Sequence, residues 1–456
     1  MASDMFRPPV NRTMKVLDRS FFQKRIPLSA LRVLDHRNIS KVRTELDRSK
    51  DIFTLARYQN IQADLSEGKL GHRCVLLRPE INAQGQPWPW SAKVQELETA
   101  DLVKLVPFEL HLDYKYWSYA ELAEAILPNA DTEDVPSSFQ NVGHVAHVNL
   151  RDQYKPYKHI IAELIVDKNA SVTTVINKID DVGEESEFRT FKYEVLAGPD
   201  DLNVELKEQN CIFKFDYSKV YWNSRLNTEH ERMVSLFKDG EAVCDVMAGI
   251  GPFALPAAKK KVFVWANDLN PESYKHLTDG IALNKVDRYV KASNENGHTF
   301  IRNAALQLAQ TDYQATEAVP LSNTKQTKTT GSSTKKVEPQ TRVQPKHFSH
   351  YVMNLPASAT DFLPDFVGLY SDMSEHGESE AKMPMIHCYC FEGKSDDNIE
   401  QGIRICELIS QKIGFTITPE TPETTIYDVR DVAPNKRMFC ASFRLPREVA
   451  FRDRTV

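Results

Sequence analysis

The sequence lacks several features that would place the protein in a special structural class. None of its apolar runs reaches the roughly 18 residues that a transmembrane helix needs, which excludes a membrane span. Its seven cysteines are scattered and include no Cys-x-x-Cys pair, which argues against a disulfide framework and against a cysteine-based zinc site. The first 30 residues have no apolar core of the kind that secretory signals carry. We therefore expect a protein of a reducing compartment, without a membrane partner and without a metal.

What the sequence does contain is typical of folded globular domains. Its 456 residues are 41% hydrophobic and 26% charged, with a formal net charge of −6. This length predicts about two to three domains. The charge is uneven, because residues 1–57 carry +7 and residues 91–134 carry −7. A basic segment on a mildly acidic protein is compatible with local contact to a polyanion, and it also fits an ordinary solvated surface.

The pattern of strands and helices divides the chain into three predicted domains. The first, residues 1–135, shows amphipathic helical spacing over 30–57, and the second, residues 136–220, has the pattern of a small α+β domain. In the third, residues 221–456, strands alternate with helices, which predicts a doubly wound parallel α/β sheet with a final antiparallel pair at its edge. Within it, residues 312–346 are rich in Thr, Ser, Lys and Gln, and we expect a disordered insertion there.

A glycine-containing turn follows the first strand of the predicted sheet, in "CDVMAGIGPFALPAA" (244–258). Asp245 ends the strand, and Gly249, Gly251 and Ala254 match the G-x-G-x-x-G/A spacing of a dinucleotide fingerprint. Asp268 follows 23 residues after Asp245, where a carboxylate can accept hydrogen bonds from ribose hydroxyls. This pattern suits NAD or S-adenosylmethionine, and the fingerprint does not separate the two.

The fourth strand of the predicted sheet ends in the segment "HYVMNLPASA" (350–359). Ligands of such sheets bind beyond the carboxyl ends of the strands. The amide of Asn354 and nearby carbonyl oxygens can hold the edge of a planar base by hydrogen bonds. An NAD enzyme has no need of such a segment, although an ordinary strand-to-loop turn also accounts for it.

Charged side chains gather in "FDYSKVYWNSRLNTEHERMV" (215–234), directly before the sheet. Thr228 with Glu231 has the spacing of a capping box, so this stretch also reads as an ordinary helix start. The functional interpretation places one carboxylate of the stretch at the mouth of the cofactor pocket. The segment "EFRTFKYEVLAG" (187–198) adds Arg189, which otherwise reads as surface charge.

Taken in order, these segments resemble the eukaryotic and archaeal tRNA (guanine-N1)-methyltransferases that act on position 37, just 3′ of the anticodon. The resemblance covers most of the chain. It runs through "MFRPPVNRTM…LDRSFF", "GHVAHVNLRDQY", "FRTFKYEVLAG", "FDYSKVYWNSRLNTEHER", "DVMAGIGPF", "NDLNP", "MNLP" and "APNKRMFCASFRLP". The segment "NENG" (294–297), in which relatives tend to carry an Asp before the Gly, is a departure, and the insertion at 312–346 is not part of the family pattern.

The resemblance implies a class I, Rossmann-like methyltransferase that uses S-adenosyl-L-methionine. Its implied reaction is transfer of a methyl group to N1 of guanine 37 in tRNA, giving 1-methylguanosine, which supports reading-frame maintenance and feeds wybutosine synthesis. By motif match, Glu229 resembles the general base, Arg189 the group that stabilises negative charge on O6, and Asn354 with Pro356 the base-holding segment. Guanine N1 carries a proton at neutral pH, so a positioned carboxylate and a guanidinium suit this reaction. The implied cofactor-binding residues are Asp245, Met247, Gly249, Gly251, Asp268, Leu269, Asn296 and Asn354.

Three other functions remain open at this point. An aminocarboxypropyltransferase of the wybutosine pathway would share the fold and the donor. A non-catalytic tRNA-binding relative would keep the fold alone, and an NAD dehydrogenase would share the fingerprint. The resemblance also implies that the N-terminal domains recognise tRNA. We expect a monomer in the cytoplasm and nucleus, with a pool in the mitochondrial matrix, because the basic N-terminus is compatible with all three compartments.

Overall fold

The computed structural model describes residues 4–64, 72–81, 91–128, 136, 139–179, 188, 190–318, 339–371 and 382–453. These residues belong to two compact units. The first unit comprises Met1–Phe139, Val148–Val175 and Leu196–Gly198, and the second comprises Gln140–His147, Ile176–Val195 and Pro199–Val456. Among the helices of the described residues, none is long and apolar enough to cross a membrane.

The first unit contains an antiparallel sheet with the strand order β2-β3-β1-β4. Its strands are β1 (Gln23–Val33), β2 (Ile61–Ala63), β3 (Arg73–Leu76) and β4 (Val103–Asp113), and its helices are α1 (Ile39–Arg48) and α2 (Ala92–Thr99). Leu31 and Val33 share one apolar cluster with Val42 of α1 and Val94 of α2. The helical prediction for 30–57 is therefore wrong at its start, because β1 continues through Val33 between two partner strands.

Two further helices belong to the first unit, α3 (Tyr119–Ile126) and α4 (Lys158–Lys168). A capping box of Ser118 and Glu121 begins α3, as its sequence predicts. Strands β5 (Phe139–Val142), β6 (Val145–Val148), β7 (Thr174–Lys178) and β8 (Tyr193–Ala197) form a four-stranded sheet in that order. The division between the two units passes through these strands, and the domain boundaries at 135 and 220 stay a prediction.

A seven-stranded sheet with the order β13-β12-β11-β16-β17-β19-β18 forms the centre of the second unit. The strands β13, β12, β11, β16 and β17 are parallel to one another. At the edge, β19 runs antiparallel to β17, and β18 runs antiparallel to β19. This confirms the predicted doubly wound fold. The strands are β11 (Ala242–Asp245), β12 (Phe263–Asn267), β13 (Val290–Ser293), β16 (His350–Met353), β17 (Met385–Gly393), β18 (Thr425–Ala433) and β19 (Lys436–Arg444).

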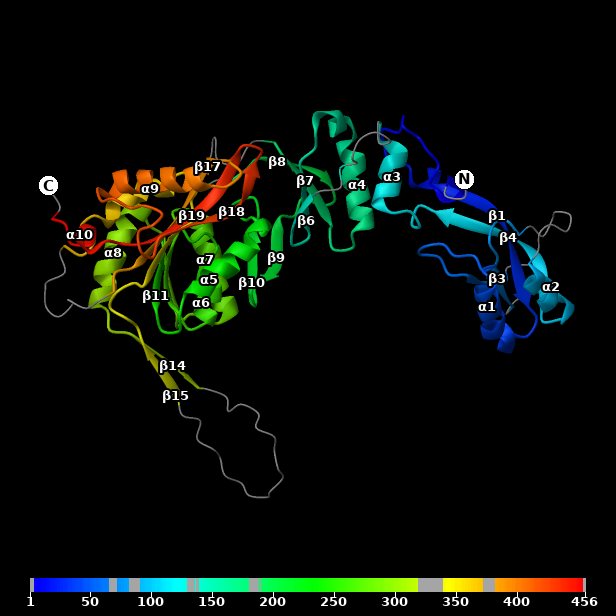
Figure 1. The fold of residues 1–456 in the computed structure, drawn as a ribbon, viewed down its shortest axis with the longest axis horizontal. Coiled ribbons are helices and arrows are strands. Elements are labelled where there is room, and N and C mark those ends of the chain that lie inside the picture. Colours follow the sequence, from blue (N-terminus) through cyan, green and yellow to red (C-terminus); the bar gives the residue numbers. More distant parts are fainter. Residues whose placement is uncertain are drawn as a thin grey trace, which may run out of the picture. The chain divides into compact units, whose positions relative to one another are not determined.

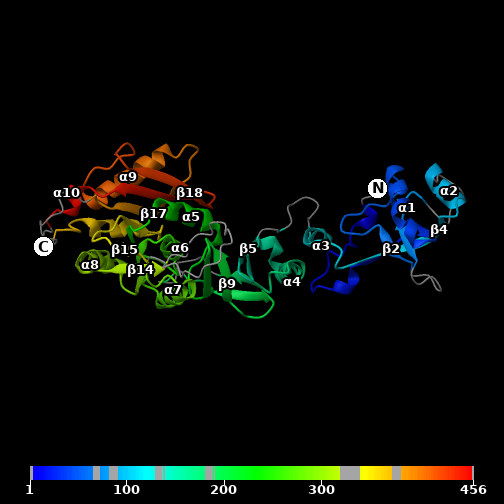
Figure 2. The ribbon, with the colours of Figure 1, turned by 90° about the horizontal axis from the view of Figure 1, so that it is seen from below.

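Helices cover both faces of this sheet. Figures 1 and 2 show α5, α6 and α7 to one side of the strands and α8, α9 and α10 to the other. The 3-10 helix η6 packs against α8 and α9. The bounds are α5 (Asn227–Leu236), α6 (Ala254–Lys259), α7 (Pro271–Asn284), α8 (Gly297–Gln310), η6 (Ala359–Phe366), α9 (Ile399–Ile413) and α10 (Arg447–Ala450).

A β-hairpin precedes the sheet in the second unit, formed by β9 (Asn203–Glu208) and β10 (Cys211–Asp216). Its two-residue turn holds Gln209 and Asn210 at positive φ, which suits the twist of the flanking strands. The side chain of Asn284 in α7 donates to the carbonyl oxygen of Ile212 and accepts from its N–H, each at 2.8 Å. The hairpin is therefore fixed to α7, and Glu208 at the end of β9 is held near α5.

The predicted disordered insertion at 312–346 is wrong at both of its ends. There, β14 (Gln314–Ala318) and β15 (Pro339–Val343) pair as an antiparallel ribbon, which Figure 1 shows leaving the body of the second unit. Residues 319–338 lie outside the described residues. Two ion pairs attach the ribbon, Lys261 with Glu317 at 2.6 Å and Arg342 Nη2 with Asp239 at 2.7 Å. Partners elsewhere in the fold thus stabilise strands whose own composition is polar.

Candidate functional site

A cavity of about 280 Å³ opens at the carboxyl ends of the parallel strands. Its lining comes from the loops that follow four neighbouring strands and from the segment before α5. Because parallel strands end at the same edge of a sheet, residues far apart in the sequence meet here. The lining includes Met247, Gly249, Asp268, Leu269, Asn296 and Asn354 from the predicted set, together with Phe188, Tyr221, Trp222, Leu226, His230, Phe253, His298, Leu355 and Phe362.

The two glycines of the fingerprint have different surroundings. Gly249 has a φ of +57° and lines the cavity, and a Cβ atom there would meet no heavy atom within 4 Å. Gly251 has a φ of +91°, and a Cβ atom there would lie 2.7 Å from Cδ1 of Leu277 in α7. Gly249 therefore leaves room for a ligand, whereas Gly251, which is not in the lining, allows helices to pack closely.

Asp268 lies at the rim between the ends of β11 and β12. Its Oδ2 accepts from the N–H of Gly249 at 2.8 Å, and its Oδ1 accepts from the N–H of Asn270 at 2.9 Å. Burial raises the pKa of Asp268 above its usual range, although these two backbone N–H groups lower it. These bonds, together with one from the side chain of Ser273, fix the carboxylate against the glycine turn, and its remaining lone-pair positions can accept from a ligand.

Asp245 is fully buried and is not part of the cavity lining. Neither of its carboxylate oxygens has a hydrogen-bond partner within the described part of the chain. Burial, and then the nearby Asp268, raise the pKa of Asp245 well above its usual value. A buried acid without partners destabilises a fold, so its presence directly before the lining residue Val246 needs a functional reason.

The segment after β16 divides between the cavity and the core. Asn354 and Leu355 line the cavity, whereas Pro356 is buried and does not. On the neighbouring loop, Asn296 caps α8 by accepting from the N–H of His298 at 2.9 Å. The ring of His298 stacks on Phe362 at a centroid distance of 4.1 Å, and both rings line the cavity. A flat aromatic wall of this kind suits a planar base.

Glu229 of α5 is buried beside the cavity but does not line it. Its carboxylate accepts from Arg232 at 2.6 and 2.7 Å and from the hydroxyl of Tyr389 at 2.6 Å. Leu226 and His230, on either side of it in the sequence, are in the lining instead. Arg189, the predicted partner of the reaction, lies outside the described residues, although its neighbour Phe188 lines the cavity.

A buried pair that the sequence did not reveal is formed by His230 and Glu208. Nδ1 of His230 lies 2.6 Å from a carboxylate oxygen of Glu208, and both side chains are less than a tenth exposed. His230 also packs edge-on against Phe253, at 5.1 Å between ring centroids. Since Nδ1 is engaged, Nε2 is the nitrogen left for a ligand. No sequence signal joins a residue of β9 to α5, because the hairpin fold brings them together.

Two family models match the chain. One is described as the TRM5/TYW2 methyltransferase domain and matches residues 204–309, and the other is described as the TYW2 N-terminal domain and matches residues 119–201. Relatives named tRNA (guanine(37)-N(1))-methyltransferase are similar over nearly the whole chain. The one from Emericella nidulans is 48% identical, over 99% of this chain and 96% of the relative. The one from Candida albicans is 41% identical, over 98% and 99%.

Solved structures share the fold. A crystal structure of Trm5b from Pyrococcus abyssi has a TM-score of 0.54 at 22% identity, covering 91% of this chain and 99% of that one. A structure of aTrm5 in complex with tRNALeu has a TM-score of 0.56 at 18% identity, with the same coverage. At these identities the likeness supports the class I methyltransferase fold and leaves the activity to the residues of the site.

Proposed function

The chain belongs to the tRNA (guanine(37)-N(1))-methyltransferase family, and from this premise we propose that it methylates N1 of guanine 37 in tRNA with S-adenosyl-L-methionine as donor. The observation that carries the proposal is the cavity at the carboxyl ends of β11, β12, β13 and β16, which gathers the matched motifs. Four relatives that cover at least 98% of this chain share the name of this enzyme.

The cavity suits the donor on three grounds. Open space beside Gly249 admits a ligand to the backbone, Asp268 offers lone pairs to ribose hydroxyls, and the His298–Phe362 wall suits adenine. When bound, S-adenosylmethionine supplies an electrophilic methyl group on a sulfonium. We assign Met247, Leu269 and Asn296 to the same binding surface, and we assign Asp245 and Gly251 to its support from behind.

Asn354 and Glu229 are the groups we assign to the guanine. The amide of Asn354 can hold the edge of the base, with Pro356 fixing the backbone behind it. Glu229 is the proposed general base for the N1 proton. Since its carboxylate is bound by Arg232 and Tyr389, it must exchange one of these partners to reach the base. Arg189 is the proposed group that stabilises charge on O6.

The test is a digest of product nucleosides. Unmodified tRNA transcript with guanine at position 37 is incubated with methyl-labelled S-adenosylmethionine, and the labelled nucleoside is identified. We expect 1-methylguanosine that disappears when position 37 is changed. Methylthioadenosine in place of S-adenosylhomocysteine would instead indicate the aminocarboxypropyl reaction. We retain this alternative because residues 119–201 match the TYW2 N-terminal domain. Absence of both products would leave a tRNA-binding protein.

The role of Glu229 has its own prediction. Glu229→Gln should lower kcat by about 10²- to 10⁴-fold, because the general base is lost. Binding of S-adenosylmethionine, measured by calorimetry, should be unchanged. Glu231→Gln is the matched control, since Glu231 is exposed two residues further along α5. Near-normal turnover of the Glu229 variant would contradict the assignment.

We also propose that the chain acts as a monomer in the cytoplasm and nucleus, with a pool in the mitochondrial matrix. The basic segment 1–57 supports this distribution, because it is compatible with import and with contact to tRNA. Fractionation of cells that express the tagged full chain, with sedimentation of the purified protein, tests both statements.

A further inference from the structure

Cationic side chains that have no carboxylate partner among the described residues gather beside the cavity mouth in the second unit. Arg225 lies between Asn223 and Leu226, both of which line the cavity. Arg430 lies on the edge strand β18. Beyond the effect of burial, it is close enough to Arg225 for that charge to lower its pKa, and close enough to Tyr221 for that hydroxyl to raise it. Lys178 forms the other side of this group, and the neutral ring of His147 lies close enough to Lys178 and Arg225 for both charges to act on it. We call Arg225, Arg430 and Lys178 the cationic cluster.

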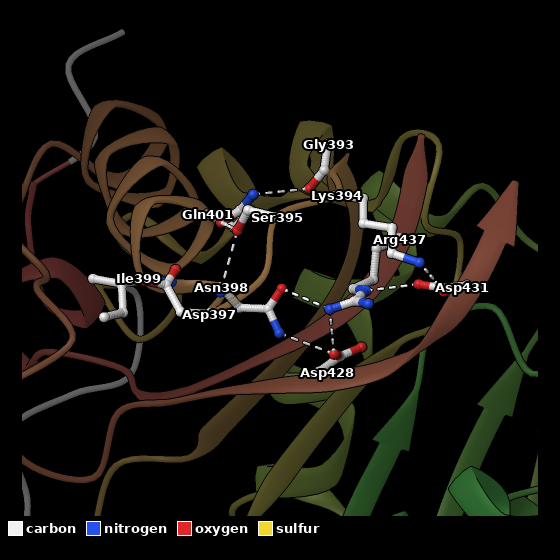
Figure 3. Close-up of polar contacts among 10 residues, drawn as sticks. All are labelled: Gly393, Lys394, Ser395, Asp397, Asn398, Ile399, Gln401, Asp428, Asp431 and Arg437. Carbon is white, nitrogen blue, oxygen red and sulfur yellow. Dashed lines mark hydrogen bonds and ion pairs between the residues drawn. The ribbon is translucent and has the colours of Figure 1, made fainter. Parts of the chain in front are cut away.

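The acidic residues next to Arg430 are bound to other cations. Figure 3 shows Arg437 contacting Asp428 and Asp431, and Lys394 contacting Asp431. Each of these contacts is 3.0 Å or shorter. Arg430 itself donates from Nε only to the backbone oxygen of Asp431. Its Nη1 is buried and has no hydrogen-bond partner in the part of the chain that the structure describes.

An irregularity in the pairing of β18 accounts for the different contacts of Arg430 and of its acidic neighbours in the strand. The register between β18 and β19 shifts between Asp428 and Arg430, and again between Asp431 and Ala433. A β-bulge of this kind redirects a side chain relative to its neighbours in the strand. The Arg430 side chain is thus not among the contacts of the Arg437 network drawn in Figure 3, and Tyr221 of the cavity lining is close enough to act on its charge.

The cationic cluster destabilises the fold by itself. Burial, and then the charge of Arg225, lower the pKa of Arg430 below its ordinary value. Burial lowers the pKa of Lys178 to about 8, while Lys178 rests over the ring of Phe191 at 3.9 Å. Burial, Lys178 and Arg225 lower the pKa of His147 to about 4, so this imidazole is neutral. Repelling cations that are partly desolvated are stabilised when an anion binds between them.

We propose that Arg225, Arg430 and Lys178 bind a phosphate of the tRNA anticodon loop, next to the nucleotide whose base enters the cavity. None of the three lines the cavity, so the anion that they fit lies outside it and is distinct from the donor's carboxylate. Tyr221, 36% exposed, lines the cavity at the same place and offers a ring to an unstacked base. Cations beside an aromatic ring are typical of sites for single-stranded nucleic acid. The inference rests on the proposed function and names the surface by which its substrate docks.

The test compares charge-removing variants of the full chain. Arg225→Gln, Arg430→Gln and the double variant are measured for tRNA affinity by filter binding over a salt series. Arg288→Gln is the matched control. It removes the same charge from an exposed loop before β13, at the opposite end of the parallel strands.

Each single variant should weaken tRNA binding about tenfold, since a hydrogen bond between charged groups is lost. The slope of log affinity against log salt should fall by about one per residue. Binding of S-adenosylmethionine should be unchanged, and so should every value for the control. An unchanged salt slope in the double variant would overturn the proposal. If the wild-type protein binds tRNA with this Arg-dependent slope but forms no 1-methylguanosine, the docking surface holds and the proposed function fails.

Discussion

At the scale of single residues, Asp245 is the position where stability and function conflict most clearly. Its carboxyl is fully buried, without hydrogen-bond partners among the described residues, and its pKa is raised by burial. Because the pKa of Asp245 is higher in the folded protein than in the unfolded chain, its contribution to the free energy of unfolding is most favourable at pH values below the unfolded pKa. It is lost as the pH rises through the folded value. At neutral pH the wild-type fold therefore contains a disfavoured acid.

Asp245→Asn should raise the free energy of unfolding of the second unit at pH 7.5, by about 1–3 kcal/mol, because the cost of burying this acid is removed. The gain should shrink as the pH falls through about 4, because the carboxyl then becomes protonated in the unfolded chain as well. Urea unfolding at several pH values measures this. Calorimetric titration with S-adenosylmethionine should show weaker binding, if the acid is kept for the donor. A variant that is less stable at pH 7.5 would contradict the argument.

The residues of the site illustrate what a sequence can reveal. Gly249, Asp268 and Asn354 stand in motifs whose spacing reflects a shared sheet edge, so their meeting in one cavity was predictable. The contact of His230 with Glu208 depends on where a hairpin packs, and the hydroxyl of Tyr389 reaches Glu229 from 160 residues away. Contacts of this kind leave no local pattern. The different surroundings of Gly249 and Gly251 are likewise set by Leu277, which no spacing identifies.

At the scale of elements, the alternation of strands and helices was readable because each has its own hydrophobic period. The error at β1 has a physical cause. Its segment Gln23–Val33 is buried at consecutive positions from Leu28 to Leu31, because β3 and β4 flank it. A continuous apolar run does not distinguish a buried strand from a buried helix. The ribbon β14–β15 was missed for the opposite reason, since its polar strands depend on ion pairs to distant residues.

The ribbon is expected to tolerate a shortened connection. Asp239 and Lys261, which hold it, precede β11 and β12 and so lie at the end of the sheet opposite the cavity. Replacing residues 319–338 with Asn-Gly should give a tight hairpin with the register of β14 and β15 preserved. Methyl transfer should stay within about twofold of wild type, because the ribbon is attached at the end of the sheet opposite the cavity. Steady-state kinetics of the shortened chain test this, and a tenfold loss would show that the ribbon serves the reaction.

At the scale of the whole molecule, some of the basic side chains of residues 1–57 form ion pairs with carboxylates of the first unit. Arg19 contacts Asp167 at 2.7 Å and Glu163 at 3.0 Å, and Arg57 contacts Glu121 at 2.8 Å. The +7 of residues 1–57 therefore overstates the cations that are available to tRNA. Net charge shows which segment is basic, whereas the fold shows which guanidinium groups lack a carboxylate partner among the described residues. Near the cavity, Arg225 and Arg430 are two such groups.

Two buried histidines should govern how the second unit responds to acid. His350 and His387 lie 3.0 Å apart between Nδ1 and Nε2 on neighbouring strands, and His387 Nδ1 lies 2.7 Å from the hydroxyl of Ser442. Burial lowers the pKa of His350 to about 4 and the pKa of His387 well below its usual value. Glu241 opposes the shift of His350, while His350, Arg232 and Arg444 add to that of His387. Both rings are thus neutral in the fold.

When the pH is lowered, a histidine whose pKa is lower in the folded protein becomes protonated in the unfolded chain before it does so in the fold. Stability is therefore full above pH 6.5 and declines as the pH falls from 6.5 toward 4, by about 1.4 kcal/mol per pH unit for each imidazole. Urea unfolding followed by tryptophan fluorescence, with Trp222 and Trp265 in the second unit, measures the decline. His387→Gln should flatten it by about one imidazole, because Gln can bond to Ser442 without titrating. The opposite contribution of Asp245 is the same in both proteins and cancels in the comparison, so an equally steep decline in the variant would place the acid sensitivity elsewhere.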